Sequence, residues 1–371
     1  MSVLASRKRM LVVGARGITG HEGGVEKFAE EFCKRASEII DVEATCLRHD
    51  DRAPTSVRVH VTGTFGFGKT DKILYYMKAA WLCLTGRYDY VFLLGINSAV
   101  LGLFTRLNPR RRPVVTVRSG SIDYLLPKWG RLAKRYFRFS EKTMRFADHV
   151  IAVSPSIQRH LSKKAIDATL VRNGITRDKG EVETQRVGAL AVGRITSQKN
   201  YSVLVEAASV LGSTPVTIVG GPDKTNEIDV LTSDIVRRGL VNLRMEGALN
   251  RQEVYERLRQ AAVFVNCSIH EGMSNSVLEA IQCGAPVLLS DIDANRDLQL
   301  PDVHYFDPND GTQLADLIEQ AMLDPESFTV NRNLFPDWDE VVETILAKIG
   351  VSKDNDIHPV HNHEPSNVAA A

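Results

Sequence analysis

The segment AVFVNCSIHEGMSNSVLEAIQCGAPVLLS, residues 262–290, contains one complete unit of the fold. It starts with a short apolar run (262–268), passes through a polar loop into a helical pattern (275–283), and returns to an apolar run (286–290). A glycine and a proline separate the helical pattern from the second run, and both residues end helices. Strand, helix and strand in this order predict two parallel strands joined by a covering helix.

The same alternation extends in both directions along the chain. Strands are expected in the first half at 9–15, 42–49, 57–63, 90–95, 113–119, 149–154 and 168–173, and in the second half at 189–193, 215–221, 242–247, 262–268, 286–290 and 304–306. Helices are expected between them at 24–38, 70–85, 97–107, 128–146, 155–163, 200–211, 251–261, 275–283, 311–323 and 338–349. Such alternation predicts an α/β protein with two Rossmann-like, doubly wound domains facing across a cleft. Ligands of such sheets bind at the carboxyl ends of the strands.

The net charge of +1 hides an asymmetry along the chain. Residues 1–184 contain 32 Lys and Arg against 18 Asp and Glu, a net charge of +14, whereas residues 185–371 contain 14 against 27, or −13. A chain of 371 residues is long enough for two domains with separate cores. The change of sign therefore predicts two domains with different surfaces, joined by the polar stretch ITRDKGEVETQRV (175–187).

We expect an N-terminal domain at 1–180, a C-terminal domain at 181–350 and a disordered tail at 351–371. The tail is polar and has no periodicity, which is typical of disorder. Its three histidines could bind a metal, but their place in an aperiodic tail favours a mobile segment. No metal site is predicted.

Cysteine usage and hydropathy favour a cytoplasmic protein. The five cysteines are scattered and form no CxxC, so neither a disulfide framework nor a zinc knuckle fits. No convincing secretory signal precedes the first strand. The longest uncharged apolar stretch (90–104) is shorter than the roughly 20 residues that a membrane-spanning helix needs.

Two glutamates in the opening segment have the spacing of a ligand clamp. Glu271 lies in the loop and Glu279 in the helix, eight residues or roughly 12 Å of helix apart. Carboxylates that far apart cannot serve one atom, but they can hold the hydroxyl-rich ends of one elongated ligand, with a diphosphate between them on the helix N-terminus. Gly272 would allow that ligand to approach the backbone. A capping box of Ser276 and Glu279, with Glu271 complementing the helix dipole, explains the same residues without a ligand.

Two cations follow an earlier strand of the acidic half. Arg194 and Lys199 lie in the segment VGRITSQKNYSVLVEA (192–207), between a strand end and a helix start. One diphosphate would satisfy both cations, although a pair of solvated surface charges is the simpler explanation when they are taken alone. Together with the two glutamates, they favour the ligand.

At this point the second half resembles the retaining glycosyltransferases of family 4, which have the GT-B fold. The resemblance rests on VGRITSQKN (192–200), VTIVGG (216–221), MEGALNRQEVYERLRQAAVFVNCS (245–268) and HEGMSNSVLEAIQCGAPVLLSD (270–291). That family has a Glu-x7-Glu motif, which Glu271 and Glu279 match. The resemblance implies that Glu279 holds the ribose hydroxyls of the donor and that Glu271 faces the donor sugar. It also implies the following diphosphate ligands: Arg194, Lys199 and backbone amides near Met273, Ser274 and Asn275. The resemblance further implies that residues 1–180 form the acceptor-side domain and that residues 181–350 form the nucleotide-sugar-binding domain. In such folds the last helix, here 338–349, often crosses back to the first domain.

The first half begins with VVGARGITGHEGGVEKFAEEFCKRA (12–36). Its first three glycines miss the GxGxxG spacing of dinucleotide-binding folds, which argues against an NAD-dependent oxidoreductase. Gly23 and Gly24 precede an amphipathic helix whose N-terminus could meet the diphosphate across the cleft. The segment resembles the GxRGI…GGxE start of family-4 enzymes that build bacterial surface polysaccharides, rhamnosyltransferases among them. KWG (128–130), FADHVIAVS (146–154) and VRNGI (171–175) fit the same resemblance.

One segment departs from the family. Many relatives carry a histidine-glycine or histidine-aspartate pair where this chain has VRSGSIDYLLPKWG (117–130). We expect Asp123 to position the acceptor hydroxyl and Arg118 to lie near the donor. His21 and Glu22, which precede the glycine pair, are weaker candidates.

The resemblance implies a retaining hexosyltransferase that moves a sugar from a nucleotide diphosphate sugar to a glycan or lipid-linked glycan in surface polysaccharide synthesis. No cofactor is expected beyond that donor substrate. DID (291–293) imitates the metal-binding DxD of the other main glycosyltransferase fold, but no metal is expected in a GT-B protein. The alternatives are a GT-B nucleotide-sugar epimerase or phosphorylase, and a non-catalytic membrane-binding scaffold.

Two basic segments raise the question of a membrane. KWGRLAKRYFRFSEKTMRF (128–146) mixes seven Lys and Arg with aromatic residues, and RLNPRRR (106–112) is also basic. They suit either a solvated basic face or adsorption to an anionic leaflet, which would make the protein peripheral at the inner face of the plasma membrane. No recognised nucleic-acid motif accompanies them, so nucleic acid is not an expected partner.

Overall fold

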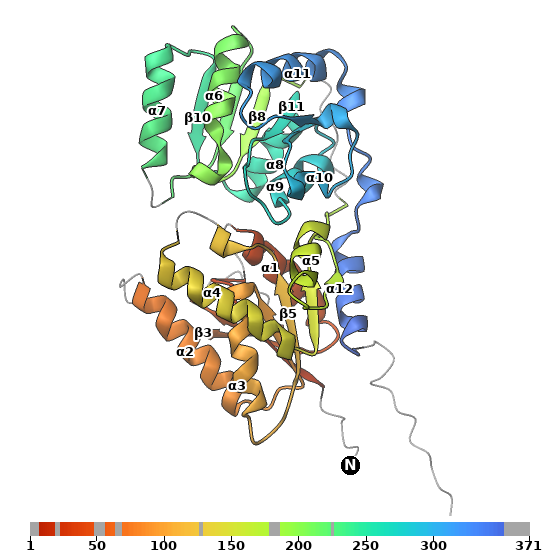
Figure 1. The fold of residues 1–371 in the computed structure, drawn as a ribbon. Coiled ribbons are helices and arrows are strands. Elements are labelled where there is room, and N and C mark those ends of the chain that lie inside the picture. Colours follow the sequence, from red (N-terminus) through yellow and green to blue (C-terminus); the bar gives the residue numbers. More distant parts are fainter. Residues whose placement is uncertain are drawn as a thin grey trace, which may run out of the picture.

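The structure, a computed structural model, describes residues 7–18, 23–47, 56–63, 69–125, 129–177, 186–223 and 226–351. Two parallel sheets, each with helices on both faces, lie one above the other in Figure 1. The predicted α/β architecture with two Rossmann-like domains is confirmed. His21 and Glu22, residues 178–185 of the expected connection, and the expected tail after Val351 lie outside the described residues.

The first sheet has seven parallel strands in the order β3-β2-β1-β4-β5-β6-β7. They are β1 (Arg9–Val13), β2 (Asp41–Cys46), β3 (Val57–Val61), β4 (Tyr90–Leu94), β5 (Val114–Ser119), β6 (His149–Ala152) and β7 (Thr169–Leu170). The helices of this half are α1 (Gly24–Ala36), α2 (Lys69–Thr85), α3 (Gly102–Arg106), α4 (Arg131–Thr143) and α5 (Pro155–Ser162). The strand order reverses between β1 and β4, and ligands of doubly wound sheets bind at the carboxyl ends of strands at such a reversal.

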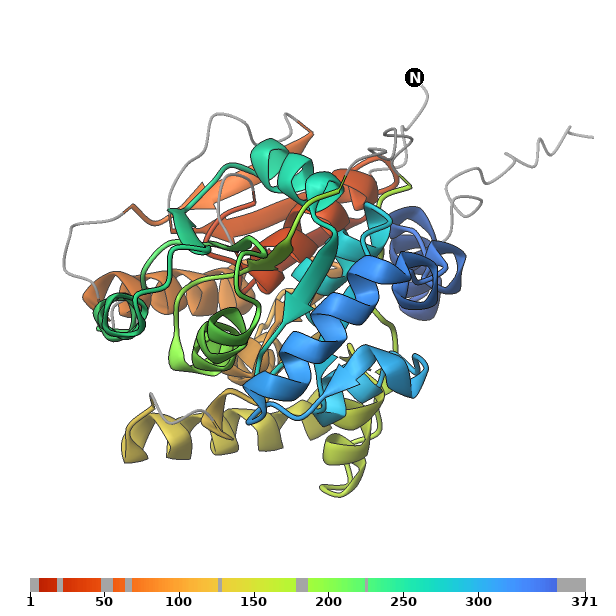
Figure 2. The ribbon, with the colours of Figure 1, turned by 90° about the horizontal axis from the view of Figure 1, so that it is seen from above.

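The second sheet repeats the plan with the order β10-β9-β8-β11-β12-β13. Its strands are β8 (Ala189–Val192), β9 (Val216–Val219), β10 (Leu243–Gly247), β11 (Val263–Asn266), β12 (Val287–Ser290) and β13 (Tyr305–Phe306). The helices are α6 (Tyr201–Val210), α7 (Glu227–Arg238), α8 (Arg251–Gln260), α9 (Asn275–Gln282), α10 (Asp293–Arg296) and α11 (Gly311–Leu323). Here the order reverses between β8 and β11. The view from above shows α11 lying across this sheet (Figure 2).

The last helix, α12 (Trp338–Lys348), belongs to the first half by its packing. It begins with a capping box, in which the Asp337 side chain accepts from the backbone N–H of Glu340 and the Glu340 side chain accepts from that of Asp337. Trp338 is only 1% exposed and lies against Phe28 of α1, with ring centroids 6.1 Å apart. The chain therefore crosses between the domains twice, and the two crossings lie side by side because Ile175 N donates to Pro336 O.

Several elements differ from the sequence expectation. The strand expected at 168–173 is reduced to β7, and the helix expected at 97–107 is a 3₁₀ helix, η1 (Ile96–Leu101), followed by the short α3. The sequence did not predict α7, because Leu231 is its only buried residue and the helix lacks a clear apolar stripe. No helix among the described residues is long and apolar enough to cross a bilayer.

One buried carboxylate stabilises the first sheet. Glu43 on β2 is hydrogen-bonded to Arg9, His60 and Tyr88. Burial alone would raise the pKa of Glu43, but these hydrogen bonds outweigh it and lower that pKa to about 2. The carboxylate therefore stays charged wherever the protein is folded above that pH.

Candidate functional site

A cavity of about 310 Å³ opens where the carboxyl ends of the second sheet face the start of α1. Its lining includes these residues that the sequence predicted: Gly23, Gly24, Arg194, Lys199, Glu271, Met273, Ser274, Asn275 and Glu279. They come from three separate stretches of the chain and from both domains. The residues that the sequence pattern singled out thus surround one cavity, at the edge where doubly wound sheets bind ligands.

The loop after β8 holds Lys199 against Glu271. Lys199 Nζ lies 2.7 Å from Glu271 Oε1, and Ser268 Oγ donates to the same oxygen at 2.8 Å. Gln198 fixes the two loops to each other, since its Nε2 donates to His270 O at 2.6 Å. Arg194, by contrast, is exposed at the cavity and has no polar side-chain partner among the described residues. Both cations reach the cavity, and Arg194 is the more exposed of the two.

Glu279 faces α1 of the other domain. Lys27 Nζ lies 3.4 Å from Glu279 Oε1 and donates to Tyr255 OH at 3.2 Å. Burial alone would lower the pKa of Lys27, but the charge of Glu279 and the neighbouring Tyr255 outweigh it and raise that pKa, so the lysine stays charged. The alternative capping box does not form: α9 starts at Asn275, its N-cap Ser274 makes no side-chain cap bond, and Ser276 lies inside the helix.

The sequence missed Lys27, Tyr255 and Arg251, which also line the cavity. Lys27 lies on the apolar side of α1, beside Phe28, where a charge is out of place unless it faces a partner. A lysine on the apolar side of a helix was therefore the sequence signal that could have identified Lys27 as a site residue. Tyr255 and Arg251 belong to α8, whose sequence RQEVYERLRQ gives no sign of which polar residues face the first domain.

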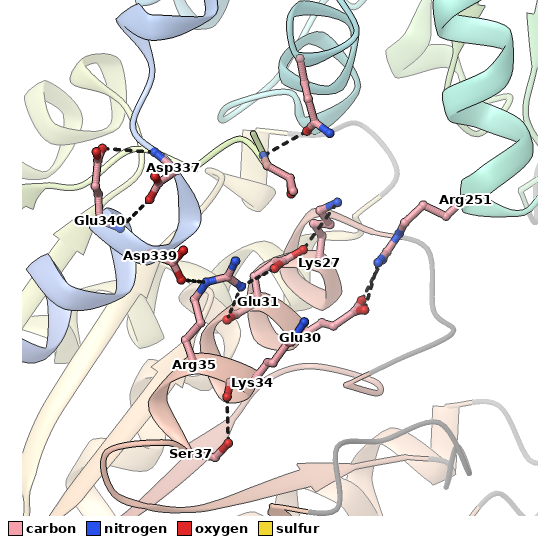
Figure 3. Close-up of polar contacts among 12 residues, drawn as sticks. Lys27, Glu30, Glu31, Lys34, Arg35, Ser37, Arg251, Asp337, Asp339 and Glu340 are labelled. Carbon is pink, nitrogen blue, oxygen red and sulfur yellow. Dashed lines mark hydrogen bonds and ion pairs between the residues drawn. The ribbon is translucent and has the colours of Figure 1, made fainter. Parts of the chain in front are cut away.

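Ion pairs along α1 connect this helix to α8 of the second domain and to α12 (Figure 3). Arg251 binds Glu30 through two hydrogen bonds of 2.9 and 2.7 Å. On the other side of α1, Arg35 contacts both Glu31 and Asp339, the latter on α12, at 2.6 Å each. Helix α1 is thus held from α8 on one side and from α12 on the other.

Two helix N-termini meet at the cavity. α1 begins after Gly23, whose φ of 153° suits glycine, and α9 begins at Asn275. A Cβ built on Gly24 would lie 3.5 Å from Asn275 Nδ2, so the first turns of these helices are close neighbours. Unpaired backbone N–H groups from both helices, together with the surrounding cations, make this the part of the cavity suited to an anion.

Gly272 has a different position from the one expected. It is buried, and a Cβ there would lie 1.7 Å from the carbonyl oxygen of Gly120 in the other domain. The residue therefore permits the loop after β11 to touch the loop after β5, rather than a ligand to touch the backbone. Steric contact between the two loops explains the need for glycine.

Arg118, one of the residues expected from the segment that departs from the family, is not among the residues that line the cavity. Arg118 is 5% exposed, and its guanidinium lies 3.7 Å above the ring centroid of Phe28. Burial lowers the pKa of Arg118 to about 9. Asp123 begins the short 3₁₀ helix η2 (Asp123–Leu125), but its side chain lies outside the described part of the structure. In the DID segment, Asp291 pairs with Arg296 at 2.6 Å.

Comparison with known proteins gives consistent results for the two halves. Residues 22–179 match the model described as Glycosyltransferase Family 4, and residues 174–332 match the model of Glycosyl transferases group 1. The O-antigen chain mannosyltransferase RfbU of Salmonella typhimurium is 21% identical, over 85% of this chain and 92% of RfbU. The putative teichuronic acid biosynthesis glycosyltransferase TuaC of Bacillus subtilis is 28% identical, over 48% of this chain and 49% of TuaC.

The matched part of the chain spans about half the length of several of these relatives, including the alpha-maltose-1-phosphate synthase of Mycobacterium tuberculosis (28% identity, 48% of this chain, 55% of the synthase). Solved structures agree on the fold. Anabaena Alr3699/HepE in complex with UDP and glucose has a TM-score of 0.70 at 14% identity, covering 93% of this chain and 96% of the other. The apo form of the lipopolysaccharide outer core galactosyltransferase WaaB has a TM-score of 0.63 at 17% identity, covering 92% and 99%.

Proposed function

Because this chain belongs to glycosyltransferase family 4 and has the two-domain GT-B fold, we propose that it is a retaining glycosyltransferase. It moves a sugar from a nucleoside diphosphate sugar to a hydroxyl of a glycan or lipid-linked glycan, in the synthesis of a surface polysaccharide. The observation that carries this proposal is the cavity between the sheets, where two carboxylates, several cations and two helix N-termini surround one space. Names of full-length relatives such as RfbU support the polysaccharide context.

The proposed roles are those that the family resemblance implies, and they are supported by the position of these residues around one cavity. Arg194, Lys199 and the start of α9 bind the diphosphate, where negative charge builds up as the glycosidic bond breaks. Stabilising that charge is the main contribution to catalysis, because fixed donors in a site with little water act strongly on it. Glu279 accepts hydrogen bonds from the ribose hydroxyls, and Glu271, held by Lys199 and Ser268, faces the donor sugar.

The reaction needs no cofactor beyond the donor substrate. The bond from the anomeric carbon to the diphosphate oxygen breaks, and a bond from the same carbon to the acceptor oxygen forms on the same face. The proton of the acceptor hydroxyl passes to the leaving phosphate. Closure of the two domains around the bound donor would exclude water from the cavity and so limit hydrolysis of the donor.

A thermal shift panel of UDP, GDP, dTDP and CDP, with their sugars, tests the donor site. A nucleotide at 100 times its dissociation constant adds roughly 2.7 kcal/mol to the free energy of unfolding. Lys199→Ala and Glu279→Ala should each remove most of the shift, whereas Lys348→Ala, at an exposed lysine of α12, should not. If both site variants keep normal affinity and turnover, the site assignment is wrong. Donor incubated without acceptor distinguishes an epimerase, and free phosphate a phosphorylase.

A second proposal concerns the outer face of the first domain, formed by α2 and α4. Ile73, Met77 and Trp81 recur every four residues along α2 and are 60, 63 and 65% exposed, so they form an apolar stripe in solvent. Helix α4 adds the exposed apolar residues Leu132 and Phe139 between basic ones. Asn97 joins the two helices, since it donates to Tyr76 and accepts from Tyr136.

We propose that this face adsorbs to an anionic membrane, which would bring a lipid-linked acceptor near the cleft and make the protein peripheral at the inner leaflet of the plasma membrane. Apolar side chains beside a basic helix suit such a surface. Sedimentation with anionic vesicles should retain the protein, with zwitterionic vesicles as the control. Replacing Met77 and Trp81 by serine should release it. Equal, weak binding to both vesicle types would identify an ordinary solvated basic face.

A further inference from the structure

Arg118 is a buried cation with no ion pair in the part of the chain that the structure describes. It lies at the end of β5, and its guanidinium is stacked on Phe28. One of its nitrogens donates to Asn173 Oδ1 at 2.7 Å, while its Nε is buried without a hydrogen-bond partner. Burying a charge without an opposite charge is costly, and an apolar side chain would pack on Phe28 as well. Such a residue calls for a role beyond packing.

The hydrogen bond of Arg118 is the first of a chain that crosses between the domains. Asn173, 4% exposed, donates from Nδ2 to Asn275 Oδ1 at 2.9 Å. Asn275 is the first residue of α9 and lines the cavity. The backbone N–H of Asn173 also contacts Met273 Sδ at 3.3 Å, which fixes the residue beside the loop. A buried side chain of one domain is thereby connected to the anion-binding end of a helix in the other.

The chemistry of arginine sets the direction of this chain. A guanidinium only donates hydrogen bonds, so Asn173 must turn its oxygen toward Arg118 and its NH₂ toward Asn275. Asn275 must then accept with its oxygen, which turns its own NH₂ away, toward the start of α1. The position of Asn275 Nδ2, 3.5 Å from where a Cβ on Gly24 would lie, agrees with this orientation. Without Arg118, both amides could rotate by half a turn and keep the bond between them.

We propose that Arg118 and Asn173 are positioning residues that fix the amide of Asn275 as a hydrogen-bond donor toward a diphosphate in the cavity. The identity of the anion rests on the proposed function, whereas the orientation rests on the hydrogen bonds alone. A reversed amide would present its oxygen to the phosphate oxygens, which repel it. The direction in which Arg118, Asn173 and Asn275 donate and accept hydrogen bonds therefore contributes to binding, and not only the presence of these side chains.

Asn173→Asp tests the direction of these hydrogen bonds and largely preserves the packing. The new carboxylate accepts from Arg118 as an ion pair, so the melting temperature should stay or rise. It cannot donate, so Asn275 must turn its NH₂ toward Asp at 173 and its oxygen into the cavity. We expect about tenfold weaker binding of inorganic pyrophosphate and of whichever of UDP, GDP, dTDP and CDP the wild type binds, a loss of about 1.4 kcal/mol. Binding of the matching nucleoside should not change.

Asn275→Ala separates reversal of the amide from the added charge. In that background Asn173→Asp should have no further effect on affinity, because the amide that it reverses is gone. An equal loss in both backgrounds would mean that charge alone acts, and would overturn the proposal. Arg118→Lys and Arg118→Gln provide a second pair if the aspartate variant does not fold. Lysine only donates and should keep the affinity, whereas glutamine can also accept and should lose it.

The two proposals fail in different ways. If a nucleotide binds the wild type and Asn173→Asp equally well, the positioning role is wrong and the glycosyltransferase proposal stands. If pyrophosphate but none of the nucleotides binds, and the variant weakens it, the positioning role stands and the proposed function falls. If the folded wild type binds neither, both are overturned.

Discussion

Gly272→Ala should separate the two domains without unfolding either of them. The new Cβ would lie 1.7 Å from Gly120 O, 2.8 Å from Gly120 C and 3.3 Å from Ile157 Cδ1. Carbon and oxygen need more than 3 Å, so the loops after β5 and β11 must part by about 1.5 Å. Both are close to strand ends and have little freedom to yield locally. The cost should be about 1–3 kcal/mol, as in other overpacked sites, but it falls on the contact between the domains.

The movement should displace residues at the cavity, because Met273 and Asn275 lie within three residues of Gly272 and both are hydrogen-bonded to Asn173. A displacement of about 1 Å near reacting groups can reduce turnover about 100-fold. The assay is turnover, or nucleotide affinity by thermal shift, together with the radius of gyration from X-ray scattering. Gly130→Ala is the matched control, since a Cβ at Gly130 meets nothing within 4 Å and its φ of −68° suits alanine. A compact Gly272→Ala variant with full affinity and turnover would refute the steric reasoning.

Three further outcomes are expected. Glu43→Gln should lower the free energy of unfolding by about 2–3 kcal/mol at pH 7. Because the pKa of Glu43 is lowered to about 2 in the folded protein, the difference in stability between wild type and variant should shrink as the pH falls from about 4.5 toward 2. Urea unfolding at pH 7 and pH 3 measures this difference. Trp338→Ala should cost about 3–5 kcal/mol and free α12, seen as faster hydrogen exchange there. Charge reversal at Arg251 or at Glu30 should lower the melting temperature by an amount worth about 0.2–1 kcal/mol, and combining the two reversals should restore it, as calorimetry would show.

The order of strands and helices could be predicted because each element carries its own pattern. Helix α9 starts at the predicted residue, and its flanking strands are where the apolar runs placed them. Helix α7 was missed because it covers the sheet edge with a single buried leucine, so its pattern is that of a surface segment. Local patterns reveal elements in proportion to the apolar area that they bury.

The residues of the candidate site also fall into those that local patterns reveal and those that they do not. Glu271, Glu279, Arg194 and Lys199 could be selected from sequence, because they follow strands within one domain. The start of α1 at Gly23 and Gly24 could also be selected, but the side chains that meet across the cleft, such as Lys27 and Arg251, could not, since no local pattern tells which side chain of α1 meets which side chain of α8 or α9. Gly272 illustrates the limit: its spacing suggested contact with a ligand, but its neighbour is Gly120, about 150 positions earlier in the chain.

The return of α12 to the first domain has a consequence for the order of events during synthesis. When the first domain emerges from the ribosome, the apolar side of α1, including Phe28, is still uncovered, because Trp338 and the residues that follow it have not yet been made. At roughly 5–20 residues per second, the stretch from 177 to 351 takes about 10–35 s to translate. During that interval a nearly complete sheet domain exists with one hydrophobic surface uncovered. Helix α12 covers this surface only after the second domain has been translated, so the domain that is synthesised first gains part of its core late.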